Sequence, residues 1–155
     1  SVRMVLLKGL SKKGFVFYTN LNSPKSFDLK RSPKAAMCFH WKSLERQVRI
    51  LGSVTQVDDK DADTYFNSRP YESRIGAWAS DQSKVMIQKE DLIKKINEYK
   101  KKYKDEKNLL RPPHWSGWCL NPSSIEFWLG DKFRIHERLK YNKESKNWEK
   151  EILYP

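Results

Sequence analysis

The sequence contains only two cysteines among its 155 residues, and they match no metal-binding spacing. Cys38 and Cys119 lie far apart among apolar or aromatic residues, so we expect two buried free thiols in a reducing, cytoplasmic compartment. The three histidines, His40, His114 and His136, are scattered along the chain. This scatter argues against a clustered zinc site, and we expect no bound metal.

Long apolar runs and several catalytic motifs are also missing. No apolar run is long enough to cross a bilayer, and we expect no membrane partner. Residues 1–8 lack the apolar region and cleavage site of a signal peptide and instead indicate a strand that begins abruptly. The chain has no nucleophile elbow, no His-Glu metalloprotease helix and no glycine-rich dinucleotide fingerprint. Redox chemistry here would need an organic cofactor, which the protein would bind and orient.

Acidic residues are too few to balance the basic ones, and the formal net charge is +12. Such an excess fits either a solvated lysine-rich surface or anionic partners, which include nucleic acid, membrane surfaces and small phosphates. Much of the excess lies between residues 84 and 107, on one predicted helix, and the rest is dispersed. Because no continuous basic stripe with exposed aromatic residues is present, we favour several phosphate-sized sites over a nucleic-acid surface.

Strand-like segments dominate the chain, which has no repeat and no low-complexity linker. Runs of β-branched and aromatic residues predict strands at 3–7, 15–19, 35–41, 46–57 (with a bulge near Gly52), 118–120, 125–129, 133–141 and 148–153. Helices are predicted at 23–31, 58–70 and 89–103. Short turns between consecutive strands predict a mainly β fold, an antiparallel barrel with peripheral helices, and one domain over residues 1–155.

Cationic side chains lie where they could bind phosphate. Arg3 and Lys8 flank an apolar strand and by alternation face opposite sides, so they could serve two ligands, although charged strand ends alone would explain them equally well. Lys25 follows Ser23-Pro24 in the first turn of a predicted helix. A cation is unfavourable there unless an anion lies nearby, although a solvent-facing lysine is the simpler alternative.

Two further groups combine cations with hydroxyl or aromatic side chains. Tyr65, Arg69 and Ser73, spaced by four residues, together offer a phenol, a planar fork and a hydroxyl that suit a phosphate ester, although Arg69 could simply end a helix. Arg134, His136 and Arg138 alternate along the predicted 133–141 strand and would share one face beside Trp128. We interpret that face as a ligand site rather than a solvated surface.

Motifs in these regions closely resemble the pyridoxine/pyridoxamine 5′-phosphate oxidase family. The resemblance extends over nearly the whole chain, in family order and spacing. The motifs are Arg3-Met4-Val5-Leu6-Leu7-Lys8, Phe17-Tyr18-Thr19-Asn20, Glu45-Arg46-Gln47-Val48, Tyr65-Phe66 with Ser68-Arg69-Pro70, Ser73 with Ile75-Gly76-Ala77-Trp78, Gln82-Ser83, and Ile125-Glu126-Phe127-Trp128 through Arg138.

The resemblance implies a split β-barrel homodimer with FMN at the subunit interface. It implies oxidation of pyridoxamine or pyridoxine 5′-phosphate to pyridoxal 5′-phosphate, with O₂ as acceptor and H₂O₂ as product. The implied FMN ligands are Arg3, Met4, Val5, Leu6, Leu7, Lys8, Tyr18, Thr19, Lys25, Gln47, Gln82, Ser83, Trp128 and Arg138. The implied substrate ligands are Lys8, Tyr65, Arg69, Ser73, Arg134 and His136, and the last two would be catalytic, over the pyridine ring.

The sequence departs from the family pattern in three places. Pro24 stands where the family usually has Arg, so one phosphate cation is expected to be missing, and Ser116 replaces a frequent Gly. The family also has an N-terminal segment with a barrel strand before the position of Ser1. The alternative function is a non-catalytic split-barrel carrier or sensor of flavin or pyridoxal phosphate, and a third hypothesis is a basic nucleic-acid-binding barrel.

Overall fold

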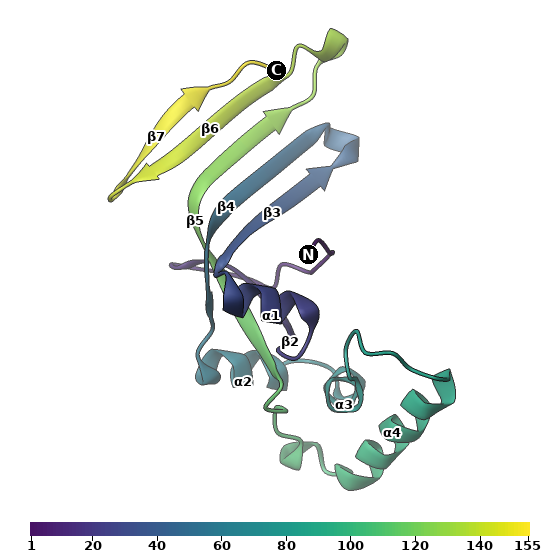
Figure 1. The fold of residues 1–155 in the computed structure, drawn as a ribbon. Coiled ribbons are helices and arrows are strands. Elements are labelled where there is room, and N and C mark those ends of the chain that lie inside the picture. The colour runs from purple at the N-terminus through teal and green to yellow at the C-terminus, as the bar shows by residue number, and fades with distance from the viewer.

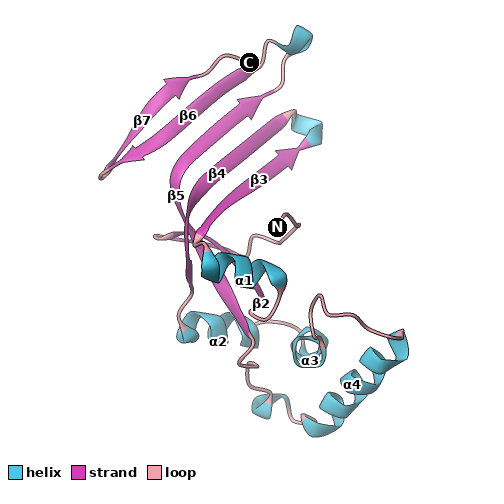
Figure 2. Ribbon diagram, viewed as in Figure 1, coloured by secondary structure: helices cyan, strands magenta, loops and turns pink.

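One seven-stranded sheet organises residues 1–155 in the computed structural model, and every strand pair in it is antiparallel. Four α-helices lie outside the sheet (Figures 1 and 2). The strands are β1 (Gly9–Ser11), β2 (Gly14–Asn20), β3 (Lys34–Trp41), β4 (Arg46–Gln56), β5 (Trp115–Leu129), β6 (Glu137–Glu144) and β7 (Asn147–Ile152). The helices are α1 (Pro24–Arg31), α2 (Asp59–Asn67), α3 (Tyr71–Ala79) and α4 (Lys89–Lys102).

The long strand β5 connects the two parts of the sheet. Its first half pairs with β2, its second half pairs with β6, and β4 follows it along almost its whole length. In Figure 1, β5 runs from the helical end of the molecule into the layer formed by β3, β4, β6 and β7. Residues near Trp115 and residues near Trp128 therefore lie at opposite ends of the molecule's longest strand.

The predicted bulge at Gly52 is confirmed. It explains why the strands predicted at 118–120 and 125–129 form one continuous strand, β5. The register between β4 and β5 shifts between Leu51 and Gly52. A Cβ atom on Gly52 would lie 2.0 Å from the carbonyl oxygen of Asn121, so only glycine fits this approach. Pro122 lies opposite Gly52. Because the ladder is already irregular there, a residue without an N–H is accommodated, and β5 continues through it.

Other boundaries also differ from the sequence-based expectation. Residues 3–7 form no strand, and the first strand begins at Gly9, where β2 offers a pairing edge. Helix α3 was not predicted, and it begins directly after Pro70, whose fixed φ suits a helix start. The three predicted helices are confirmed as α1, α2 and α4. No helix combines the length and apolar character that crossing a membrane requires.

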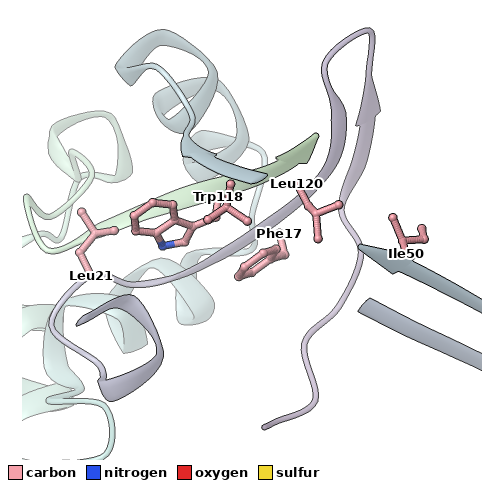
Figure 3. Close-up of a cluster of buried hydrophobic side chains, with 6 residues drawn as sticks. Phe17, Leu21, Ile50, Trp118 and Leu120 are labelled. Atoms are coloured by element: carbon pink, nitrogen blue, oxygen red, sulfur yellow. The ribbon is translucent and has the colours of Figure 1, made fainter. Parts of the chain in front are cut away.

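Two clusters of buried apolar side chains hold the helices against the sheet. The first joins β2, β4 and β5 near the start of α1, and Figure 3 shows Phe17, Leu21, Ile50, Trp118 and Leu120 within it. The second contains Phe66, Ile75, Leu109 and Trp115, with aromatic side chains of α4 packed against it. Both clusters include residues from the first half of β5, so the helices pack against this part of the strand.

The second half of the sheet leaves large apolar side chains exposed. Trp41, Phe127 and Ile152 retain 46%, 45% and 79% of their accessible surface. Cys38 is also exposed on β3, so the expectation that both cysteines are buried was wrong for this one, whereas Cys119 is buried and both thiols are free. Alternation on an edge strand turns Cys38 away from the core, because the sheet buries only one face.

Candidate functional site

A cavity of about 720 Å³ opens between the N-terminal segment, β2, the start of α1, α2 and α3. Many of the residues predicted as ligands from the sequence line it. They are Met4, Val5, Leu6, Lys8, Tyr18, Thr19, Lys25, Tyr65, Arg69, Ser73 and Gln82. The segment before β1 thus lines the cavity without forming a strand.

Lys25 is buried at the beginning of α1 with its ammonium group inside this cavity. Its Nζ donates hydrogen bonds to the hydroxyl groups of Thr19 and Ser23 and to Oε1 of Gln82. Burial, together with the nearby charge of Arg3, lowers the pKa of Lys25 to about 8. No carboxylate contacts Lys25, so its charge is held only by neutral oxygens and is available to an anion.

Arg69 is another cation of this cavity that lacks a carboxylate partner. Its guanidinium lies 4.8 Å from the ring centroid of Trp115 and 5.9 Å from that of Phe66. Burial lowers the pKa of Arg69, and its buried Nη1 has no hydrogen-bond partner. A buried donor without an acceptor is costly, so this atom indicates a place for a ligand oxygen.

A stack of aromatic rings forms one wall of the cavity. Tyr18 and Tyr65 stack at 4.0 Å between ring centroids, and Tyr18 stacks on Trp115 at 5.3 Å. Burial, with the charge of Asp61, raises the pKa of Tyr18, so its phenol stays protonated at neutral pH. The rings give the site a flat apolar surface next to its cations, an arrangement suited to a planar ligand that carries phosphate.

A second group of predicted ligands lies at the far end of β5. Gln47, Trp128 and Arg138 are directly opposite one another on β4, β5 and β6, so their side chains share one face. The rings of Trp128 and His136 lie 4.7 Å apart, and Nδ1 of His136 accepts a hydrogen bond from the backbone N–H of Asp131. Because Nδ1 is the acceptor in this hydrogen bond, Nε2 is the ring nitrogen that can donate to a ligand.

The carboxylate of Glu126 lies next to this row. Arg49 donates to one of its oxygens, and Nε of Arg138 donates to the other at 2.9 Å. Burial alone would raise the pKa of Glu126, but the hydrogen bonds from the two arginines more than offset this and lower it below its usual value. Nη1 of Arg138 donates to the carbonyl oxygen of Tyr154 at 2.9 Å.

The prediction that Arg134, His136 and Arg138 share one strand face was wrong. Arg134 ends a short 3-10 helix, Lys132–Arg134, and β6 begins only at Glu137. Asp131 accepts from the N–H of Lys132, which starts this turn in place of a tight hairpin. Arg134 has φ of +64° and its neighbour Phe133 has φ of +57°. Such values are rare outside glycine and often occur at functional sites.

The two groups of residues do not meet within one chain. Trp115 borders the cavity, whereas Trp128 lies thirteen residues further along β5, roughly 40 Å away if the strand were straight. Three predicted ligands fall outside both groups. Arg3 affects Lys25 through its charge, Leu7 is partly exposed beside the cavity segment, and Ser83 follows Gln82 with φ of +68°.

The cavity also includes residues that were not predicted as ligands from the sequence. Trp115, Asn20 and Ser80 line it, and Nδ2 of Asn20 donates to the carbonyl oxygen of Ser80. Asn20 stands within a quoted motif, but it resembled an ordinary strand end. Trp115 follows Pro112-Pro113 and resembled the start of a core strand. Its stacking on Tyr18 could not be inferred without the pairing of β2 with β5.

Comparison with known proteins identifies the family. Residues 1–103 match the family described as pyridoxamine 5′-phosphate oxidase, and residues 115–155 match the pyridoxine 5′-phosphate oxidase C-terminal dimerisation region. The chain belongs to the pyridoxamine 5′-phosphate oxidase family. It is 62% identical over 156 residues to the pyridoxine/pyridoxamine 5′-phosphate oxidase of Pelagibacter ubique, covering 100% of this chain and 75% of that protein. The corresponding Agrobacterium fabrum protein is 50% identical, with 100% and 76% covered.

Solved structures confirm the fold of this family member. PhzG from Burkholderia lata, in complex with tetrahydrophenazine-1-carboxylic acid, superposes with a TM-score of 0.92 at 26% identity, covering 100% of this chain and 75% of that chain. A pyridoxamine 5′-phosphate oxidase-related, FMN-binding protein from Nostoc punctiforme superposes with a TM-score of 0.77 at 15% identity, covering 99% and 80%. The predicted mainly β split-barrel fold is confirmed, and the dimerisation region supports the predicted homodimer.

Proposed function

We propose that this family member oxidises pyridoxamine 5′-phosphate or pyridoxine 5′-phosphate to pyridoxal 5′-phosphate with FMN as cofactor. The observation that carries the proposal is a pair of cations in one cavity, the buried Lys25 and the half-buried Arg69, neither of which has a carboxylate partner. Two phosphorylated ligands, one flavin and one substrate, need two such groups. The relatives in Pelagibacter ubique and Agrobacterium fabrum carry the name of this oxidase.

The residues around Lys25 fit the phosphate end of FMN. The ammonium group of Lys25 is held by hydroxyl and amide oxygens of Thr19, Ser23 and Gln82, so a phosphate can approach it without displacing a carboxylate. The positive end of the α1 helix dipole adds a favourable field for an anion. When bound, FMN would supply the two-electron acceptor for the oxidation, with O₂ as the final acceptor of two electrons and two protons to give H₂O₂.

The residues around Arg69 fit the substrate phosphate. The unpaired Nη1 of Arg69 requires an acceptor, and the hydroxyl groups of Tyr65 and Ser73 and the ammonium group of Lys8 line the same cavity. A phosphate oxygen bound to Arg69 would form a charge-assisted hydrogen bond, the strongest kind available to a guanidinium. This grouping would position the phosphate end of the substrate.

We assign the second group of residues to the same site through a second subunit. Arg134 and His136 lie at the far end of β5 and cannot reach the cavity of their own chain. In a homodimer they would face the cavity of the other subunit, with Gln47, Trp128 and Arg138 against the flavin at the interface. Arg134 and His136 would then hold the pyridine ring of the substrate. Residues 1–155 would act as one FMN-binding unit within each subunit.

The test combines a spectrum with a turnover assay. Purified protein, after incubation with FMN, is expected to keep a flavin absorption spectrum near one FMN per chain through gel filtration. Added pyridoxamine 5′-phosphate should give pyridoxal 5′-phosphate and H₂O₂ in aerated buffer. Flavin binding without turnover would favour the carrier or sensor, and absence of flavin binding would contradict both the oxidase and a flavin carrier.

A further inference from the structure

We infer that Glu126 is a positioning residue, which orients the guanidinium of Arg138 toward the flavin, and this inference rests on the flavin role proposed above for Arg138. The evidence is the hydrogen-bond network in which Glu126 joins Arg138 on β6 to Arg49 on β4. Neither Glu126 nor Arg49 was assigned a role in the site from the sequence.

Glu126 is buried to an extent that needs explanation. It retains 8% of its accessible surface, and buried carboxylates are costly unless they are paired. Its direct neighbours across the sheet are Arg49 on one side and Lys140 on the other. Glu126 nevertheless bonds to Arg138, which is diagonal to it, while Lys140 lies 3.9 Å from Glu151. The carboxylate is thus directed at the arginine that stands beside Trp128.

The network leaves one side of the Arg138 guanidinium free. Nε is used by Glu126 and Nη1 by the carbonyl oxygen of Tyr154, whereas Nη2 makes no hydrogen bond within the chain. Two fixed donors determine the plane of the guanidinium, and the third is left for a ligand. A long arginine side chain loses considerable rotamer freedom when it binds a ligand, so fixing it beforehand improves affinity.

The charges of Glu126, Arg49 and Arg138 also support a role in ligand binding. One carboxylate faces two arginines, so the cluster retains one positive charge on the face that carries Gln47 and Trp128. Of the two arginines, Arg138 is the one beside Trp128 and has an unpaired Nη2, so the charge offered to a ligand is that of Arg138. A purely structural ion pair between β4 and β5 would need only Arg49 and Glu126.

The test compares FMN dissociation constants of apoproteins, measured by quenching of flavin fluorescence, with thermal unfolding midpoints. Glu126→Gln is expected to weaken FMN binding roughly tenfold or more, as loss of a charge-assisted hydrogen bond does. Arg49→Met is the matched control. It removes the ion pair between Arg49 and Glu126 and leaves the ion pair between Arg138 and Glu126 in place. It should keep the FMN dissociation constant within about twofold while lowering the unfolding midpoint.

A double-mutant cycle of FMN dissociation constants distinguishes a positioning role of Glu126 from a purely structural one. In an Arg138→Met background, Glu126→Gln should not weaken FMN binding further, because its effect passes through Arg138. An equal loss of FMN affinity in Arg49→Met and Glu126→Gln, or an additive loss in the cycle, would overturn the inference. If Glu126→Gln does not fold, the double variant Glu126→Met with Arg49→Met replaces it, since it leaves no unpaired charge on β4. Compared with Arg49→Met alone, it should show the loss of FMN affinity expected of Glu126→Gln. Failure of the wild-type chain to bind FMN would refute the proposed function itself.

Discussion

The guanidinium of Arg69 lies 4.8 Å from the ring centroid of Trp115 while its buried Nη1 remains unpaired. A cation–π contact attracts a guanidinium to the face of a ring without using any of its N–H donors. Trp115 therefore holds Arg69 in place and leaves its donors to the substrate phosphate. Arg138 is held differently, because two of its donors are used by protein oxygens.

Replacing Trp115 should consequently affect the substrate more than the flavin. We expect Trp115→Leu to raise KM for pyridoxamine 5′-phosphate about fivefold to thirtyfold, in line with a cation–π contact of about 1–2 kcal/mol. Trp115→Phe retains an aromatic face and should lie between wild type and Trp115→Leu. Steady-state kinetics on FMN-saturated protein, with circular dichroism to establish folding, measures the effect. Identical KM values for the Leu and Phe variants would contradict the role of the ring.

The buried amine of Lys25 predicts a pH dependence of flavin binding. Its pKa is about 8 in the free protein, and a bound phosphate would raise it by favouring the ammonium form. FMN affinity should therefore be constant between about pH 7 and 8 and fall at higher pH, approaching about tenfold per unit. Lys25→Arg stays charged throughout and should show a flat profile. Fluorescence titrations from pH 7 to 9.5 test this, and a parallel decline in both proteins would exclude Lys25 as the titrating group.

The side chain of Arg134 should contribute to turnover more than to flavin binding. We expect Arg134→Ala to lower kcat on the order of a hundredfold, the usual cost of a misplaced reacting ring, with FMN occupancy nearly unchanged. Because Arg134 has φ of +64°, Arg134→Gly is a useful control, which removes the same side chain and relieves backbone strain. Similar kcat values in both variants would attribute the loss to the side chain. Equal losses of FMN and kcat would refute its substrate role.

Much of the fold could be predicted from local sequence patterns. The helices α1, α2 and α4 follow from caps and amphipathic spacing, and the glycine bulge follows from Gly52 within a long β-branched run. The continuity of β5 through Pro122 could not be predicted, because it depends on a partner strand with an irregular ladder at the same place. Local patterns also cannot reveal that residues 3–7 lack a pairing partner.

The cavity residues were predicted better than their arrangement. The ligands near Lys25 and Arg69 were identified through the resemblance, and the structure brings them together. The assumed alternation of Arg134 and His136 failed because Asp131 starts a helical turn, a local choice that strand propensity does not encode. The contribution of Trp115 and the network at Glu126 arise from contacts between distant strands, which only the fold defines.

A mixture of inactive variants should recover activity if each site combines residues of two subunits. Arg69→Ala removes a cavity residue, and Arg134→Ala removes a residue from the far end of β5. In a heterodimer of the two variants, one site carries both substitutions and the other carries neither. Random reassociation makes about half of the dimers mixed, and one of the two sites in each mixed dimer is intact. About a quarter of all sites should therefore be intact, and the mixture should regain about a quarter of wild-type activity. Unfolding and refolding the two variants together, with each refolded alone as control, measures this. A mixture no more active than its components would show that each site is built within one chain.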